Sequence, residues 1–111
     1  MRKTKTEKVA VLVPYLNVMD LDKSLALVRA IRHPIRQKML QQMHAQGEVT
    51  VTDLYIKMRM EQSLASQHLA LLRRAGVVKT RREGKFIFYA VNYERLEHIS
   101  GLFSQLAATV N

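Results

Sequence analysis

Apolar residues recur every three or four positions in several separate stretches of this 111-residue chain, a spacing typical of amphipathic helices. The pattern predicts a first helix over residues 20–31. It predicts a second over 34–45, because proline is favoured at the first position of a helix. His33 then caps the second helix and Gly47 ends it.

The middle of the chain predicts a short strand followed by two more helices. The strand spans residues 48–51, and Thr52 is placed to cap a third helix. A fourth helix is expected over 62–75, where Gly76 stops it.

Two stretches rich in β-branched and aromatic residues, 77–80 and 86–91, predict a hairpin whose turn is 81–85. Asn92 then caps a last helix that runs to about residue 109. Packing explains the aromatic side chains of the hairpin, Phe86, Phe88 and Tyr89. The order of elements predicts a mostly α fold with a small β-hairpin (α+β), a winged helix-turn-helix.

Charge is unevenly distributed along the chain. Eighteen Lys and Arg stand against nine Asp and Glu, a net charge of +9, which indicates a polyanionic partner. Residues 73–85 hold six cations and one carboxylate, whereas residues 92–111 hold one arginine and two glutamates. Nucleic acid is the first candidate partner, and an anionic membrane surface is the second.

We expect a single domain over residues 19–111, preceded by a basic, partly flexible arm over 1–18. The chain has no cysteine, which excludes disulfides and thiolate metal sites. The apolar segment 9–13 is too short for a signal peptide, and no longer apolar run suggests a membrane span. We therefore expect a cytoplasmic protein with no cofactor. Without a nucleophile motif, a phosphate loop or a carboxylate–histidine cluster, we expect no enzyme.

On a helical wheel, the fourth helix separates into two faces. One carries short polar and cationic side chains around the small Ala70: Gln62, Ser63, Ser66, Gln67, Arg73 and Arg74. The other is apolar: Leu64, Ala65, Leu69, Leu71 and Leu72. Serine and glutamine hydrogen-bond base edges, and arginine binds guanine or phosphate, so the polar face suits a DNA major groove. The alternative is an ordinary solvated surface.

Three cations at the hairpin turn, Arg81, Arg82 and Lys85, are candidate phosphate contacts. His68 lies within the apolar arc of the fourth helix. A packed structural histidine is the first interpretation of it, and a phosphate contact from its ring edge is the second.

The last helix carries a heptad seam, with Leu96, Ile99, Phe103, Leu106 and Val110 spaced by three and four residues. Together with Leu21 and Leu25 of the first helix, this seam predicts a homodimer interface; packing onto the chain's own core is the alternative. A twofold dimer presents two DNA-reading helices about one DNA turn apart, which predicts a palindromic operator.

The chain resembles the ArsR/SmtB family of bacterial winged-helix repressors over about residues 20–106. The resemblance is carried by three segments: AIRHPIR at 30–36, QSLASQHL at 62–69 running into LRRAGVV at 72–78, and RREGK at 81–85 followed by YAV at 89–91. The likeness implies dimers joined through the first and last helices, with repression relieved by an inducer.

The chain departs from the family's metal-sensing pattern. Residues 52–59 hold no cysteine, and Arg95 stands where a histidine ligand is expected on the last helix. Glu94 and His98 share one helical face, but two such residues are more often a surface pair, so no metal site is predicted.

The sequence therefore predicts a sequence-specific regulator that binds double-stranded DNA. We expect a dimeric repressor that contacts its operator through helix 62–75 and wing 81–85, with an inducer that is unidentified. The alternative is a winged-helix module for protein or RNA contacts. A third hypothesis is a peripheral membrane binder, but we expect that the protein does not bind membranes.

Overall fold

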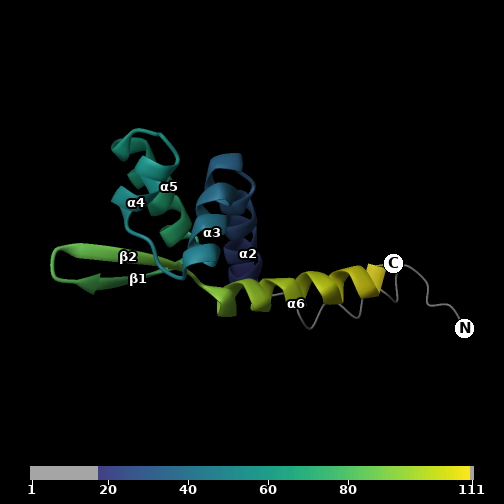
Figure 1. The fold of residues 1–111 in the computed structure, drawn as a ribbon. Helices are drawn as coiled ribbons and strands as arrows, with labels where there is room; N and C mark the ends of the chain where they lie inside the picture. The colour runs from purple at the N-terminus through teal and green to yellow at the C-terminus, as the bar shows by residue number, and fades with distance from the viewer. Residues whose placement is uncertain (1–17, 111) are drawn as a thin grey trace, which may run out of the picture.

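A computed structural model describes residues 18–110 of the chain (Figure 1). Its elements are α2 (Val18–Ile31), α3 (Pro34–Gln46), α4 (Val51–Lys57), α5 (Gln62–Arg74), β1 (Val78–Glu83), β2 (Phe86–Val91) and α6 (Tyr93–Val110). The predicted fold, mostly helical with one antiparallel hairpin, is confirmed. The predicted N-terminal arm lies outside the described residues except for Val18, which begins α2.

The start and end of α3 follow the prediction. The Nδ1 atom of His33 accepts a hydrogen bond from the backbone N–H of Ile35 at 3.1 Å, and Pro34 occupies the first helical position. At the other end, Gly47 adopts a φ of 86° and its N–H donates to the carbonyl of Met43 at 2.7 Å. This left-handed conformation favours glycine, which is why the helix ends there.

The predicted cap of α4 is wrong by two residues, because Thr50 and not Thr52 begins the helix. The Thr50 hydroxyl accepts from the N–H of Asp53 at 3.2 Å, and the Asp53 carboxylate accepts from the N–H of Thr50 at 3.0 Å. Such a reciprocal box needs an acidic or amide side chain three residues after the cap. Thr50 has Asp53 there, whereas Thr52 has Tyr55.

The early start of α4 also shortens the predicted strand over 48–51. Only Val49 pairs with the hairpin, through two backbone hydrogen bonds with Tyr89 of 2.8 and 3.0 Å. Thr50 already belongs to the helix cap, so the strand cannot continue.

The hairpin is longer than predicted, and its turn is tighter. Residues Arg81 and Arg82 pair with Phe88 and Ile87 inside the ladder, so they belong to β1 and not to the turn. Gly84 and Lys85 alone connect the strands, with Gly84 at a φ of 61°. A glycine at the first of two loop positions suits the twist of such hairpins, which allows the ladder to extend to Glu83.

The core lies between the helices and the base of the hairpin. Its largest fully buried side chains come from α2 to α5 and the segments beside the strands: Leu27, Met39, Met43, Leu54, Leu69, Leu72, Val49 and Val77. These residues fix α5 against the body from behind.

The last helix, α6, leaves the body of the molecule beyond the hairpin (Figure 1). Asn92 caps it as predicted, since its Oδ1 accepts from the N–H of Arg95 at 3.3 Å. Its Nδ2 also donates to the carbonyl of Gly76 at 3.1 Å, which ties the start of α6 to the end of α5. Within residues 18–110, no helix combines the length and apolarity that a membrane crossing requires.

Candidate nucleic-acid interface

Helices α4 and α5 pack together as a helix-turn-helix, joined by residues 58–61 (Figure 1). Arg59 in this turn has a φ of 52°. A left-handed residue reverses the chain within a short connection, and for a side chain larger than glycine it stores about 1–2 kcal/mol of strain. The packing of both helices therefore holds this turn in place.

All six polar residues predicted for the outer face of α5 are exposed. They are Gln62, Ser63, Ser66, Gln67, Arg73 and Arg74. The predicted apolar arc is narrower than expected, because Leu64 and Leu71 are 38% and 40% exposed. Both lie at one edge of that arc, beside Gln67 and Arg74 on the helical wheel.

The inner face of α5 is the part that anchors it. Ala65, Leu69 and Leu72 are each at most 1% exposed, and they pack in one cluster with Leu54 of α4. Burial of this apolar stripe orients the helix, so the serine and glutamine side chains opposite it point to solvent.

His68 is packed, as the first interpretation of it predicted. Its ring is 8% exposed, and its Nδ1 accepts a hydrogen bond from Nε of Arg36 at 3.2 Å. The ring also lies 4.7 Å from the ring of His33, centroid to centroid. So little of His68 faces solvent that we do not include it among the phosphate contacts.

Arg36 joins three helices at this point, a role that the sequence did not reveal. Its Nη1 donates to the carbonyl of Ala30 at 3.0 Å and to that of Arg29 at 3.4 Å, both at the end of α2. Its Nε holds His68 of α5. Desolvation of the buried ring is the largest cause that lowers the pKa of His68, and the electrostatic influence of His33 and Arg36 lowers it further. The ring therefore stays neutral, as an acceptor for Arg36 must.

In the structure the wing is the whole hairpin Val78–Val91, which extends on both sides of the predicted segment 81–85. Arg81 is already paired within it. Its guanidinium donates to both carboxylate oxygens of Glu48, at 2.7 and 3.2 Å, and to Glu83 at 2.8 Å. It also lies 4.6 Å from the centre of the Phe88 ring. These hydrogen bonds raise the pKa of Arg81 and lower that of Glu48. Arg81 thus ties the wing to the segment before α4, and a phosphate would have to compete with two carboxylates for it.

Arg82 and Lys85 fit the predicted phosphate role better. Both are exposed near the tip of the wing, and neither forms an ion pair with any side chain that the structure describes. Arg82 makes only a long hydrogen bond of 3.4 Å to the carbonyl of Gly84. Of the three cations predicted at the turn, Arg81 therefore anchors the wing, and Arg82 and Lys85 are available.

The expectation that packing explains the hairpin aromatics is wrong for one of them. Phe86 is 52% exposed and its neighbour Ile87 is 38% exposed, whereas Phe88 and Tyr89 are half-buried. Phe86 pairs with Glu83 next to the loop, beyond the reach of the core. The ammonium of Lys85 lies 5.5 Å from the centre of its ring.

The residues predicted to form the dimer seam differ in their surroundings. Ile99 is 4% exposed and belongs to the core of its own chain, and Leu96 packs against that core, as the alternative interpretation held. Leu25 is 49% exposed on α2. The side chains of Leu21, Phe103 and Leu106 lie outside the described residues.

Among the side chains that the structure describes, no group of three or more metal-binding residues comes together. Glu94 and His98 are both exposed on α6. Nothing in the described part of the chain adds a third ligand to this pair.

Comparison with known proteins places this geometry in a family. The profile of bacterial regulatory proteins of the arsR family matches residues 33–80, which contain the helix-turn-helix and the start of β1. The transcriptional activator HlyU of Vibrio cholerae is 32% identical over 108 residues, covering 89% of this chain and 99% of HlyU. The transcriptional repressor PagR of Bacillus anthracis is 29% identical over 91 residues, covering 82% of this chain and 91% of PagR.

Solved structures agree with the sequence comparison. The PagR crystal structure matches with a TM-score of 0.65 and 30% identity, over 78% of this chain and 99% of that chain. The structure of HlyU from Vibrio cholerae matches with a TM-score of 0.63 and 32% identity, over 78% and 94%. Since HlyU is similar along almost its whole length and the family profile covers the helix-turn-helix, this chain belongs to the ArsR family of bacterial transcriptional regulators.

Proposed function

We propose that this protein is a homodimeric repressor that binds a palindromic operator in double-stranded DNA. In this proposal α5 lies in the major groove as the recognition helix, and the tip of the wing contacts the phosphate backbone. The observation that carries the proposal is the outward orientation of Ser66 and Gln67 on a helix whose opposite face is anchored in the core by Ala65, Leu69 and Leu72.

The chemistry of the exposed face supports base recognition. A glutamine amide pairs in a bidentate manner with adenine, a serine hydroxyl donates or accepts, and arginine pairs with guanine. Ala70 is small and exposed in the middle of this face, which allows the helix to approach the bases closely.

The cations around this face support affinity and register. Arg73 and Arg74 end the recognition helix, and Arg82 and Lys85 extend the positive surface to the tip of the wing. Phosphate contacts of this kind position a protein on DNA without carrying sequence information. The proposed division of labour is therefore charge for affinity and the outer face of α5 for sequence preference.

The exposed Leu25 and the family membership support a dimer built on α2 and α6. Two recognition helices related by a twofold axis would read half-sites about 34 Å apart, or roughly ten base pairs. An inducer that releases the operator completes the proposed cycle of repression.

The exposed Phe86 at the wing favours a second candidate function, a winged-helix module that contacts protein or RNA. Exposed aromatic side chains stack on unpaired bases or anchor protein interfaces. This candidate predicts that Phe86→Ala weakens binding more than substitutions on the outer face of α5.

Selection from random duplex DNA tests the first proposal, with sedimentation of the same sample to measure mass. We expect enrichment of an imperfect palindrome with half-sites one helical turn apart, bound by a protein of twice the chain mass. Unbiased recovery of sequences, or equal capture of single-stranded RNA, would contradict it.

A further inference from the structure

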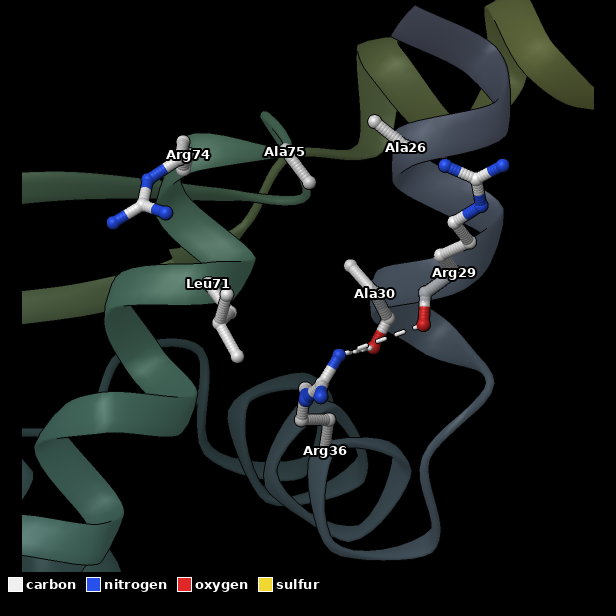
Figure 2. A pocket seen from close by; sticks show the side chains of 7 residues that line it. All are labelled: Ala26, Arg29, Ala30, Arg36, Leu71, Arg74 and Ala75. Atoms are coloured by element: carbon white, nitrogen blue, oxygen red, sulfur yellow. Dashed lines mark hydrogen bonds between the residues drawn. The ribbon is translucent and has the colours of Figure 1, made fainter. Parts of the chain in front are cut away.

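A cavity of about 340 Å³ lies between α2 and the C-terminal half of α5 (Figure 2). Its apolar wall is made of Ala26 and Ala30 on one side and of Leu71 and Ala75 on the other. Alanine faces alanine and leucine across this gap, so the two helices leave space that larger residues would fill. The volume is at the lower end of the range for small-molecule sites.

Three arginines surround this apolar wall. Arg36 closes one end, and Arg29 and Arg74 lie on opposite rims (Figure 2). In this view the guanidiniums of Arg29 and Arg74 point outward, and both side chains are exposed. Neither forms an ion pair within the described part of the chain, and no carboxylate lines the cavity there. Exposed arginine side chains without a carboxylate partner are available to a bound anion, and the planar guanidinium loses less rotamer freedom per hydrogen bond than a lysine ammonium does.

We propose that this cavity binds a small organic anion with an apolar body, of the aryl or alkyl carboxylate class. The carboxylate would meet Arg29 and Arg74 at the rim, where guanidinium geometry matches it. The apolar body would lie against Ala26, Ala30 and Leu71. A DNA phosphodiester has no apolar part to cover that wall, which is why the cavity suits a ligand and not the backbone of the operator.

The ligand would oppose DNA binding, a consequence that rests on the proposed function. Arg74 belongs both to the cavity rim and to the proposed phosphate contacts, so a carboxylate bound to it makes that guanidinium unavailable to DNA. Leu71 lies one helical turn after Gln67 on the same helix. A ligand packed against Leu71 would therefore contact the recognition helix directly. By linkage, DNA must weaken binding of the ligand by the same factor.

Titration of the full chain with 2-naphthoate, followed by the probe's fluorescence in the absence of DNA, tests the site. The uncharged isostere 2-naphthamide is the matched control for the charge. We expect saturable binding of the acid and at least tenfold weaker binding of the amide, about 1.4 kcal/mol.

Two substitutions locate the site. Ala26→Leu fills the cavity with a good helix former, and we expect it to abolish the titration. Arg29→Gln removes a rim charge, and we expect about a tenfold loss of affinity. Arg32→Gln, an exposed arginine near the end of the same helix that does not line the cavity, should leave the affinity unchanged. Circular dichroism of each variant identifies any that fails to fold.

Several results would overturn the proposal. These are no saturable binding of 2-naphthoate, equal binding of acid and amide, and full binding by folded Ala26→Leu and Arg29→Gln. If Ala26→Leu loses DNA affinity in the absence of the probe, the cavity binds backbone phosphate, and this result would also contradict the proposal. A chain that binds no duplex at all would refute the proposed function, whereas the titration without DNA would still decide the cavity.

Discussion

The two sides of the segment from α5 to the tip of the wing differ in polarity and in solvent exposure. The inner side of α5 is apolar, and its central residues Leu69 and Leu72 belong to the core and are at most 1% exposed. The outer side carries Ser66, Gln67 and the cations of the wing, all exposed. Substitutions on the inner side should therefore change stability, and those on the outer side should change binding. A residue that affected both would mark the place where this separation fails.

The largest effect is expected from Leu72→Ala on the inner side. Removal of a fully buried leucine side chain leaves a cavity and should cost about 2–5 kcal/mol in the free energy of unfolding. Denaturation followed by circular dichroism measures it. Gln67→Ala on the opposite face is the control and should stay within about 0.5 kcal/mol. Equal destabilisation by both would show that the two faces are not distinct.

The second-largest effect is expected on the outer side, from the double substitution Arg82→Gln and Lys85→Gln. Without these two cations, binding to all DNA sequences should weaken alike. The slope of log K against log salt should fall by about one for each phosphate that the variant no longer neutralises. Titrations at several salt concentrations measure it, with Lys23→Gln on α2 as a control that also removes a positive charge. A selective loss for one sequence would assign these side chains to bases instead.

A smaller effect is expected at the helix that supports α5. Thr50→Ala removes the cap of α4 and should destabilise the protein by about 1 kcal/mol. Thr52→Ala, two residues away on the same helix, should have almost no effect on unfolding. A larger loss of stability in Thr52→Ala than in Thr50→Ala would show that Thr52 is the cap.

The smallest effect concerns the pH dependence at His68. Because burial holds its pKa below the unfolded value of 6.5, the unfolded chain binds a proton first as pH falls. Stability is therefore complete above that unfolded value and declines as pH falls toward the lower folded pKa. His68→Gln keeps an acceptor for Arg36 but cannot titrate, so it should flatten this decline. His98→Gln, at an exposed position, should not flatten this decline. The same change in both variants would show that His68 is not its cause.

The sequence predicts most of this fold because its signals are local. Pro34 after His33 marks the start of α3, and the polar and apolar faces of α5 follow from helical spacing. The cap at Thr50 was also local, but the choice between two threonines depended on Asp53. The extended ladder through Arg81 was missed because arginine and glutamate are not typical strand residues, and the two-residue loop at Gly84 decided it.

Pairs of residues far apart in the chain were the part that the sequence did not predict. Glu48 and Arg81 are 33 positions apart, and nothing in the spacing of either indicates that they meet. Arg36 and His68 are separated by 32 positions. In both cases the three-dimensional packing of α3, α5 and the wing creates the pair. The exposed position of the candidate residues was therefore predictable from the sequence, but not which of their cations are already paired with carboxylates.

Whether the outer face of α5 reads the operator is decided by the base preference of a Ser66→Ala, Gln67→Ala double variant. The variant and the parent chain would each be equilibrated with the same pool of randomised duplexes at one salt concentration, and the bound fraction sequenced. If Ser66 and Gln67 contact the bases, we expect a changed or relaxed preference at the half-site bases, with the same unfolding midpoint and the same affinity for nonspecific DNA. An identical preference in both proteins would show that the outer face of α5 does not read the sequence.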